Sequence, residues 1–541
     1  MNRYSLWDSP WIPGLDLSGQ PRKLSLRDAL VQADQLREVF DPSPLIVGAV
    51  SRLLHAVLYR VFSPWNQKDW EGLWKSGKFC SRQLDEYGNI YANRFDLLNP
   101  ERPFYQVPKE EGVKEHPISA LALEAASGNN PTLFDHGKIE GQDWMPLDRA
   151  ACYLVAHQSF AVGGGVSKPF NRMDSTLTKG ILVQAAGRNL FESLLLNLIP
   201  LVYWERYVPS PHGNDCPFWE IDDPPEPERK GTIPRGPLHY LTWQSRRIYL
   251  CVDETKSNVV GCQIQQRYAL PRTGEKIDPY KPYIKSDKEG WQPLKLDRER
   301  AVWRHSHVLL QRGQKIEGQG VSAPFLSEWL SQVQWLFRKK NNLPQIIDLN
   351  IAGLTTHPRR AAKIELWRRE HLPIPAVFFA NEELVHILEQ QLLKTAAYET
   401  HLYRTSLALA WALGERKSVP AVLPYIWTGK VSKENIKKSN SYRPIANSFG
   451  MVARFWPALE EPFRRLLHDL PVEEINSVSK SWNQSLRDVT RQSYYDVRDS
   501  MLYERNTYDV LSQIEQAFMG KLSKIYTSHE GEEVCEHEEA N

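Results

Sequence analysis

The sequence has 541 residues, more than a single hydrophobic core usually supports, so two or three domains are expected. Apolar residues make up 41% of the chain and charged residues 24%, the proportions of an ordinary globular protein. The 67 Lys and Arg residues nearly balance the 65 Asp and Glu residues, for a net charge of +2. This balance excludes a protein that binds nucleic acid through its overall charge, and leaves local basic patches or binding shared with partner subunits.

Cysteine usage and the N-terminus indicate the compartment. The six cysteines form no C-x-x-C pair, which argues against a structural zinc site, and scattered free thiols are typical of a reducing cytoplasm. Residues 1–8 contain no apolar segment of the kind found in signal peptides. The longest apolar run, residues 194–204, is interrupted by Asn197 and Pro200 and is too short to span a bilayer. We therefore expect a cytoplasmic protein with no membrane partner and no bound metal.

The first two thirds of the chain predict helices mixed with irregular β structure. Ser25 and Asp28 have the spacing of a helix N-cap and its N3 residue. Residues 46–62 carry apolar side chains three and four apart, as in an amphipathic or buried helix. The proline-bounded segment 95–106 is interpreted as a packed structural loop. Further elements are expected in chain order: helices over 148–162 and 176–200, a β-containing subregion over 201–300, a helix over 321–341 and a short buried strand over 345–351.

A boundary falls near residues 372–375, and the pattern beyond it is simpler. Asn381 can cap a helix with an acidic first turn, which Gly414 can end. Three further long amphipathic segments follow, and Pro457 and Pro462 are expected to kink the first of them. Their ranges are 441–469, 473–498 and 505–526. Four long helices with short links predict a four-helix bundle.

The predicted fold class is therefore α+β. It comprises a large mixed, mainly helical N-terminal domain with irregular β elements over 1–375 and a C-terminal four-helix bundle over 376–528. The acidic tail over 529–541 is expected to be disordered, because it has too few apolar residues to bury.

Motifs that carry catalysis in other proteins are missing from the sequence. It contains no P-loop, no G-x-S-x-G nucleophile elbow and no H-E-x-x-H zinc motif. The neighbours Asp135 and His136, and likewise His468 and Asp469, have no further ligands at a suitable spacing and are interpreted as surface or packing pairs. We therefore predict no enzymatic activity, no catalytic residue and no cofactor, and binding becomes the leading hypothesis.

The first of three features that suggest nucleic acid is the triplet Gly163, Gly164 and Gly165, with Lys168 just beyond it. Without side chains, the backbone there can approach a shallow minor groove or a phosphate closely. The alternative is a tight connection between two helices.

The second feature is a turn-rich loop over 127–137 that carries Leu133 and Phe134. Glycine, asparagine and proline in succession disfavour both helix and strand. An apolar pair on such a loop can wedge against a base. The alternatives are a hydrophobic contact with its own domain or with a partner protein.

The third feature is the basic interval 336–372. It holds eight Lys and Arg residues against three acidic ones, for a local charge of +5. Such clusters mark phosphate contacts, although a solvated helix face explains this one equally well. The segment 430–438, which the pattern assigns to a loop of the bundle, is a second basic candidate with the same alternative.

Together these motifs, in this order and spacing, resemble the CasA family, the large subunits of the type I-E Cascade complex of prokaryotic CRISPR systems. The resemblance rests on Trp11-Ile12-Pro13, Arg94-Phe95-Asp96-Leu97, Pro100-Glu101-Arg102-Pro103-Phe104, residues 127–136, the glycine triplet, Lys363-Ile364-Glu365-Leu366-Trp367-Arg368, Arg454-Phe455-Trp456 and Arg464-Arg465-Leu466-Leu467. It implies a subunit that binds duplex DNA, reads the protospacer-adjacent motif (PAM), helps to open the duplex and recruits a helicase-nuclease.

The resemblance also implies roles for individual residues. Gly163, Gly164 and Gly165 would lie against the PAM minor groove. A loop that meets the 5′ end of the CRISPR RNA and other Cascade subunits would contain Asn129, Asn130, Thr132, Leu133, Phe134, Asp135 and His136. The cysteine pairs that bind zinc in some relatives are missing.

Two further PAM-reading elements of the family transfer less directly. A lysine that enters the minor groove corresponds to Arg267, Arg272 or Lys276. The family's glutamine wedge falls where this chain has Arg359 and Arg360, so either an arginine takes the place of the glutamine or the wedge is weaker. Two alternatives stay open: an assembly adaptor that binds no nucleic acid, which would show no salt-dependent DNA binding, and a cryptic nuclease, against which the missing metal-ligand cluster argues.

Overall fold

The computed structural model describes residues 3–124, 144–208, 214–297, 301–310, 315–316, 319–334, 346–357, 360–415, 424, 427, 433–501 and 508–538. The chain divides into two compact units, one made of residues 1–336 and 346–373 and the other of residues 337–345 and 374–541. The division at 373/374 falls inside the segment where the sequence pattern changes.

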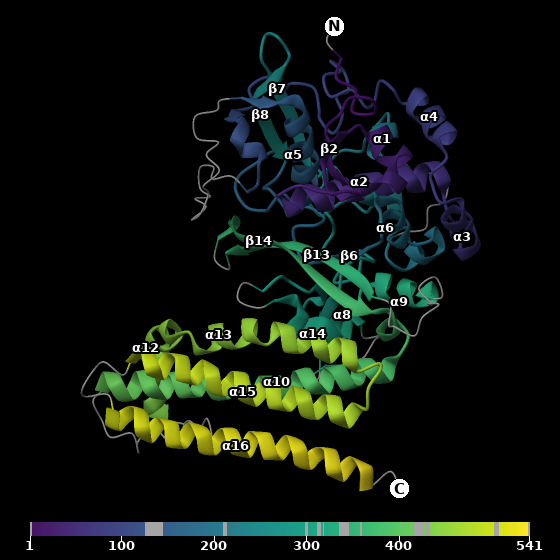
Figure 1. Cartoon of the computed structure of the whole chain (residues 1–541). Coiled ribbons are helices and arrows are strands. Elements are labelled where there is room, and N and C mark those ends of the chain that lie inside the picture. The colour runs from purple at the N-terminus through teal and green to yellow at the C-terminus, as the bar shows by residue number, and fades with distance from the viewer. Residues whose placement is uncertain are drawn as a thin grey trace. The chain divides into compact units, whose positions relative to one another are not determined.

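The helices of the first unit include one long, apolar and largely buried helix, α2 (Figure 1). They are α1 (Leu26–Val31), α2 (Pro44–Phe62), α3 (Gln67–Ser76), α4 (Ser81–Ile90), α5 (Leu147–Phe160), α6 (Leu190–Leu196), α7 (Pro237–Leu241), α8 (Ser306–Leu310) and α9 (Phe325–Gln332). Short 3-10 helices lie between them: η1 (Ala33–Gln35), η2 (Ile118–Leu121), η3 (Leu201–Arg206), η4 (Phe218–Glu220) and η5 (Val302–His305).

Local sequence signals set the starts of α1 and α2. The Ser25 hydroxyl accepts the Asp28 N–H at 3.0 Å, which confirms the predicted N-cap. Ser43 caps α2 with Pro44 in its first turn, and the buried residues of α2 confirm the helix expected over 46–62.

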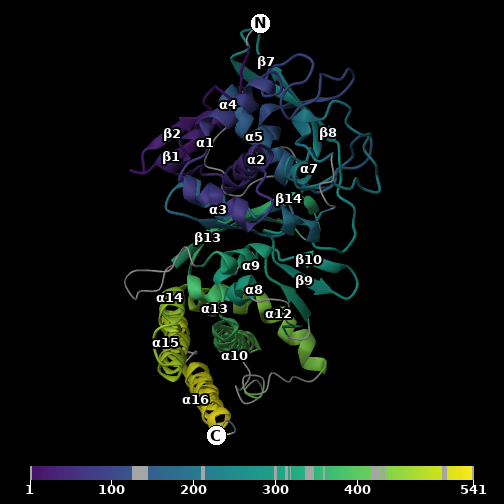
Figure 2. The same ribbon diagram turned by 90° about the vertical axis from the view of Figure 1, so that its right-hand side faces the viewer.

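Within the described residues, the strands of the first unit form four small sheets. The first has the order β2 (Pro21–Leu24), β1 (Ile12–Asp16), β3 (Leu36–Val39), and the second β10 (Gly290–Pro293), β9 (Tyr283–Ser286), β12 (Gln319–Ser322), β11 (Lys315–Ile316). The third has the order β14 (Arg360–Pro375), β13 (Ile346–His357), β6 (Leu182–Ala186). In the fourth, β4 (Glu115–Pro117) and β5 (Met145–Pro146) pair with β8 (Asn258–Gln266), which also pairs with β7 (Arg246–Val252). Figure 2 shows β7 and β8 as a long antiparallel hairpin.

Long-range strand pairing overrides several helix predictions. The helix expected over 176–200 is wrong, because 182–186 form β6 and only 190–196 are helical. In β6, Leu182 and Val183 gain backbone partners from β13, with Ile351 opposite Val183. The helix expected over 321–341 is confirmed only as α9. In the basic interval, residues 360–372 belong to β14, so the solvated helix face considered for them is wrong.

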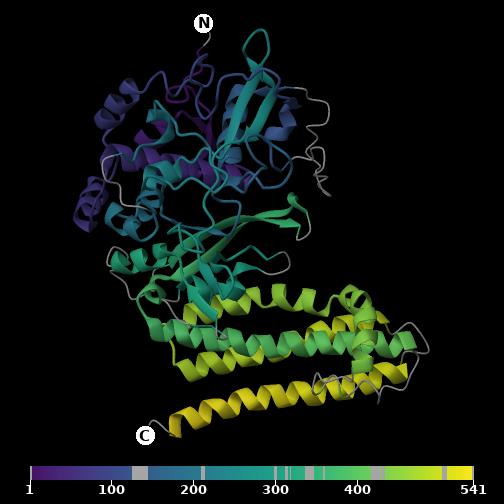
Figure 3. The ribbon, with the colours of Figure 1, turned by 180° about the vertical axis from the view of Figure 1, so that it is seen from behind.

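The second unit is helical, which confirms the expected fold class of a mixed N-terminal part and a helical C-terminal part. After η7 (Ala376–Phe379) it contains α10 (Glu382–Glu415), α12 (Lys433–Phe449), α13 (Met451–Ala458), α14 (Glu460–Asp469), α15 (Ile475–Met501) and α16 (Tyr508–Glu538). Figure 3 shows α10, α15 and α16 running lengthwise beside one another. Asn381 accepts the Leu384 N–H at 3.1 Å, as expected for the cap of α10.

Aromatic contacts join these long helices. The ring of Phe518 in α16 stacks on His401 of α10 at 4.8 Å and on Tyr494 of α15 at 4.3 Å between centroids. His401 Nε2 also lies 3.0 Å from the Phe518 carbonyl oxygen. One side chain thereby fixes the spacing of three helices.

Three details of the second unit differ from the sequence predictions. The segment over 441–469 breaks at Gly450 and Leu459, while Pro457 lies inside α13 and Pro462 in the first turn of α14, where its missing N–H costs little. The basic segment 430–438, expected as a loop, is helical from Lys433. The helix α16 continues to Glu538 through residues expected to be disordered, since glutamate favours helices.

Candidate nucleic-acid interface

The glycine triplet opens a returning loop that follows α5. The Gly164 N–H donates to the Arg172 carbonyl at 2.8 Å, and the Arg172 N–H donates to the Gly165 carbonyl at 3.2 Å. These bonds pair the outgoing and returning legs, so residues 165–171 form the tip. Gly165 is exposed, and the Val166 side chain beside it is 90% exposed. The tip thus presents a small apolar surface and nearly bare main chain to solvent.

Glycine is favoured at the three positions of the triplet for different physical reasons. Gly164 and Gly165 have φ of 100° and 86°, in the left-handed region that favours glycine. A Cβ on Gly165 would meet nothing within 4 Å, so space outside it is open. Gly163 is buried, and a Cβ there would lie 3.0 Å from the Asp174 carboxylate. Gly163 therefore closes the base of the loop, whereas Gly165 is the glycine that faces outward.

A buried arginine holds both legs of the loop. Arg246, the first residue of β7, is 1% exposed. Its Nη2 donates to the carbonyls of Val162 at 3.0 Å and Met173 at 2.7 Å, one on each leg. Its Nη1 donates to the Ser245 carbonyl at 3.1 Å and to Gln266 Oε1 at 3.0 Å. One planar fork thereby joins the two legs of the loop to β8.

The charge of Arg246 is compensated by neutral acceptors. No carboxylate lies within ion-pair distance of it among the residues that the structure describes. Burial, followed by the nearby charge of Arg172, lowers the pKa of Arg246, and the charge of Asp174 opposes this. A charge placed this way depends on every one of its hydrogen bonds, because an unpaired buried charge is very costly.

Two buried glutamines also connect Arg246 and the glycine loop to α5 and β8. Gln158 in α5 accepts the Arg246 N–H and donates to the Arg246 carbonyl, both at 2.9 Å. The Gln266 N–H donates to Ser167 Oγ at 2.9 Å, and Gln266 Oε1 accepts the Met173 N–H at 2.8 Å. These buried polar groups were missed in the sequence, where they carry no motif. One weak signal for a buried arginine was present: adjacent arginines in a strand point to opposite faces, so one of Arg246 and Arg247 must face inward.

Positive charge lies at the tip of the loop. Lys168 is exposed, and no carboxylate contacts its ammonium group among the described residues. The one acidic group of the loop, Asp174, accepts the Gly163 N–H at 2.7 Å and pairs with Lys179 at 3.0 Å. The loop therefore offers a free cation and a neutralised carboxylate, a combination that suits phosphates.

The structure separates the three basic residues expected over 264–276. Arg267 directly follows Gln266, which contacts Ser167 beside Lys168, so it belongs to the same neighbourhood. Arg272 is exposed on the segment after β8. Lys276 is half-buried; its ammonium lies 4.9 Å above the Trp291 ring and donates to Ser322 at 3.1 Å. Burial lowers the pKa of Lys276. Lys276 is thus engaged in packing, whereas Arg267 follows a residue that contacts the glycine loop and its own side chain lines a cavity with Arg94 and Arg102.

The basic interval is mostly neutralised where it is described. Arg369 donates to Glu38 at 2.6 Å and to Asn350 at 3.1 Å, and Arg368 pairs with Glu370 at 2.6 Å. Arg360 begins β14, while Arg359 lies outside the described residues. The net charge of this interval therefore overstates its free cations.

With this geometry in place, the comparisons with known proteins decide the family. The family model of the CRISPR-associated protein Cse1 matches residues 5–493. The chain belongs to the CRISPR-associated Cse1 family. A CasA/Cse1 protein of Thermus thermophilus is 28% identical over 553 residues, with 99% of each chain covered. The resemblance to the CasA family drawn from the motifs is thereby confirmed.

Solved Cse1 structures share the fold. The crystal structure of Thermus thermophilus CasA matches with a TM-score of 0.75 at 25% identity, covering 97% of this chain and 100% of its own. Cse1 of Acidimicrobium ferrooxidans matches with a TM-score of 0.77 at 21% identity, covering 98% and 99%. A chain of a CRISPR RNA-guided surveillance complex matches with a TM-score of 0.71 at 19% identity, covering 96% and 100%.

Two further properties of this Cse1-family chain bear on the sequence predictions. Among the described residues, no group of three or more His, Cys, Asp or Glu could hold a metal ion. One described helix, α2, is long and apolar enough to cross a membrane by length and composition, but 72% of its most apolar window is buried inside the protein. That burial is typical of a core helix.

The loop that the resemblance assigns to the guide RNA falls outside the described residues. This applies to Asn129, Asn130, Thr132, Leu133, Phe134, Asp135 and His136. Its preceding residue Glu124 is described: the Ser43 hydroxyl at the start of α2 donates to its carboxylate. Burial raises the pKa of Glu124 to about 7, so the carboxyl is partly protonated at neutral pH.

Proposed function

We propose that this Cse1-family protein is the large subunit of a CRISPR RNA-guided surveillance complex that binds duplex DNA and reads the PAM from the minor groove. The observation that carries the proposal is the exposed tip of the glycine loop, with Gly165 and Lys168, whose two legs are held by buried Arg246. Bare main chain can enter a narrow groove where side chains would clash. The minor groove carries a degenerate donor and acceptor pattern, so such a reader accepts several PAM variants.

Base pairing with the guide RNA would then supply the remaining specificity, as in other RNA-guided systems. The protein would help to start strand separation beside the PAM, with Arg267, Arg359 and Arg360 as the basic groups near the duplex, and the complex would recruit the helicase-nuclease. Arg272 and Lys276 take a lesser part in this proposal. We infer no catalytic activity for the chain itself, and a location in the prokaryotic cytoplasm.

The experiment that tests the proposal is a gel-shift titration of the assembled complex on PAM-containing duplex at several salt concentrations. A protein that replaces counterions on phosphates loses affinity linearly in log salt, with a slope close to the number of phosphate contacts. We expect a steeper slope with this subunit than without it, and tighter binding to a PAM duplex than to a scrambled one. Equal slopes and equal affinities would instead favour the adaptor that touches no nucleic acid.

The proposal also assigns residues 129–136 to the CRISPR RNA 5′ end and neighbouring Cascade subunits. This part rests on the resemblance of the Asn130–His136 motif to the family. Replacing Phe134 with alanine removes the large apolar group of the loop, and we expect the subunit to dissociate from the complex at roughly tenfold higher concentration, as for an interface anchor. Co-purification of Phe134→Ala with the other subunits at wild-type yield after dilution would contradict this assignment.

A further inference from the structure

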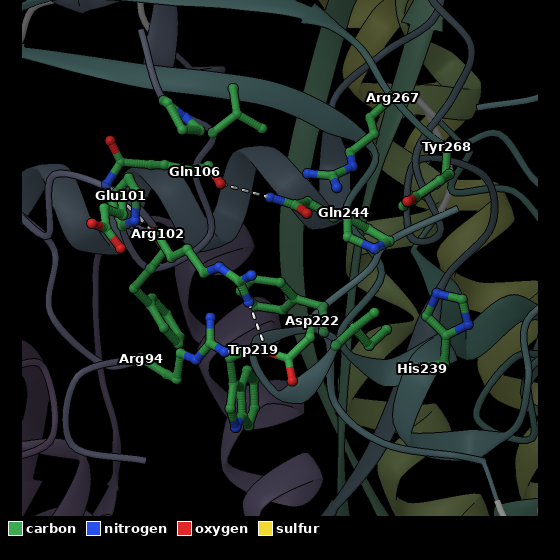
Figure 4. A pocket seen from close by; sticks show the side chains of 17 residues that line it. Arg94, Glu101, Arg102, Gln106, Trp219, Asp222, His239, Gln244, Arg267 and Tyr268 are labelled. Carbon is green, nitrogen blue, oxygen red and sulfur yellow. Dashed lines mark hydrogen bonds and ion pairs between the residues drawn. The ribbon is translucent and has the colours of Figure 1, made fainter. Parts of the chain in front are cut away.

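A cavity of about 230 Å³ opens in the first unit where segments far apart in the sequence meet (Figure 4). Its walls come from the turn after α4, from η4 and the segment that follows it, from α7 and from the residues that follow β8. Sites for drug-sized ligands are usually about 300–1,000 Å³. This cavity is smaller than that range, so it limits a ligand to about the size of one small nucleotide.

Three arginines line the cavity, and their guanidinium groups point into the same region in Figure 4. Arg94 and Arg102 share one carboxylate, that of Asp222, with Arg102 Nη1 2.7 Å from it. The Asp222 side chain is 69% exposed, so an incoming anion can take its place. Arg267 lies 5.1 Å above the Tyr268 ring and has no carboxylate within ion-pair distance among the described residues.

A buried histidine adds a directed hydrogen-bond donor. His239 lines the cavity, is 2% exposed, and its Nδ1 accepts the Arg235 N–H at 3.1 Å. Burial lowers the pKa of His239 to about 4, helped by Arg235 and Arg267. The ring is therefore neutral at pH 7 with its proton on Nε2, and no acceptor for that N–H is found among the residues that the structure describes.

Aromatic rings form the remaining walls. Phe218 and Trp219 of η4 each lie 5.7 Å from Phe104 between ring centroids, and the Trp219 indole N–H is fixed by the Tyr87 hydroxyl at 2.7 Å. Tyr268 is tied to the Pro225 carbonyl at 2.7 Å. Rings held in this way offer stacking surfaces to a planar ligand at little entropic cost.

We propose that this cavity binds one nucleoside monophosphate unit. Its phosphate contacts Arg267 and, in place of Asp222, Arg102; its base lies against the aromatic walls and accepts the His239 Nε2–H. Two sources of this unit share the chemistry: a free nucleotide, or one nucleotide turned out of an opened DNA strand. The second source rests on the proposed function; the Ser167–Gln266 hydrogen bond joins the glycine loop to the residue before Arg267, and Arg267 lines the cavity.

The test is a calorimetric titration of the full-length protein with thymidine 5′-monophosphate, repeated with thymidine and with inorganic phosphate. We expect millimolar or tighter binding of the nucleotide and at least tenfold weaker binding of either half alone. Two variants alter the cavity: His239→Phe removes the donor but keeps a ring, and Val107→Trp fills the space from a half-buried lining position. Val260→Trp makes the same change at an exposed position of β8 outside the cavity and is the control.

Both cavity variants should weaken nucleotide binding at least tenfold, while Val260→Trp leaves it unchanged. A single strand carrying 2-aminopurine, followed by fluorescence, separates the sources: quenching in the wild type but not in Val107→Trp assigns the strand, and its absence assigns the free nucleotide. No binding of either probe, or equal binding by Val107→Trp and Val260→Trp, would overturn the proposal. Duplex gel shifts run in parallel keep the outcomes apart, because retained duplex affinity with no nucleotide binding removes the cavity alone.

Discussion

Replacing Arg246 with alanine will lower the free energy of unfolding by about 3–5 kcal/mol and abolish the order of the glycine loop. The substitution leaves the carbonyls of Val162 and Met173 without their side-chain donor and opens a cavity beneath them, while the Ser245 carbonyl keeps the Arg267 N–H at 3.0 Å. Each unsatisfied buried group costs about 1–3 kcal/mol, and losing a buried charged partner ranks among the largest single-residue effects.

The neighbouring residue provides a matched control. Arg247 lies on the opposite face of β7, with its side chain 33% exposed and paired with Glu110. Partly exposed ion pairs contribute about 1 kcal/mol or less, so Arg247→Ala should unfold close to wild type. Urea unfolding followed by tryptophan fluorescence measures the difference. Similar losses for the two alanine variants would show that Arg246 is not a special anchor.

Local order can be measured where global unfolding is too severe. Arg246→Lys keeps the charge and loses part of the fork, so it should fold and still loosen the loop. Hydrogen exchange over 161–175 is expected to rise in this variant, because the N–H groups of Gly164 and Arg172 lose their fixed geometry. Wild-type protection of that segment in Arg246→Lys would mean that the two legs hold together without the guanidinium.

Replacing Gly165 with aspartate will weaken PAM-duplex binding of the complex by about tenfold or more at low salt. The residue is exposed with open space around it, so the new carboxylate points toward whatever the tip contacts. A unit charge about 4 Å from a phosphate repels it by about 1–4 kcal/mol depending on local screening, and tenfold corresponds to about 1.4 kcal/mol. The loss should shrink as salt rises.

Asparagine at the same position separates charge from strain. Asn and Asp both tolerate the left-handed φ of 86° better than other residues with side chains, and they have nearly the same shape. Gly165→Asn should therefore keep most of the affinity that Gly165→Asp loses. Gly19→Asp, at φ of 82° on the exposed β1–β2 turn with nothing within 4 Å, reports the cost of strain elsewhere in the unit. Equal affinities of the Asn and Asp variants would show that the tip of the loop does not contact a phosphate.

Local features were the ones that the sequence allowed us to predict. The N-cap at Ser25, the apolar periodicity of α2 and the acidic first turn of α10 depend on residues within a few positions of one another, so they can be read along the chain. The glycine triplet likewise signalled a special backbone, and its positive φ values agree with that.

Strand pairing and burial decided the features of the fold that the sequence did not predict. The segment that forms β6 has a helix-like pattern, but it is a strand because β13, more than 150 residues later, supplies its hydrogen-bond partners. The sequence predicted free positive charge at Arg368 and Arg369, but in the structure they form ion pairs with Glu370 and Glu38. In each case the deciding partner is distant in sequence or depends on the direction of a side chain.

The candidate site shows the same division. The amino-acid sequence by itself determined the family and the position of the glycine loop, because glycine runs and short motifs are defined by residues that are adjacent in the chain. Only the tertiary structure revealed that Gly163 is buried while Gly165 faces solvent, that Arg246 fixes both legs from below, and that Arg94, Arg102 and Arg267 line one cavity. These are consequences of which distant segments come into contact, and a buried polar group shows its role only when its partners are in place.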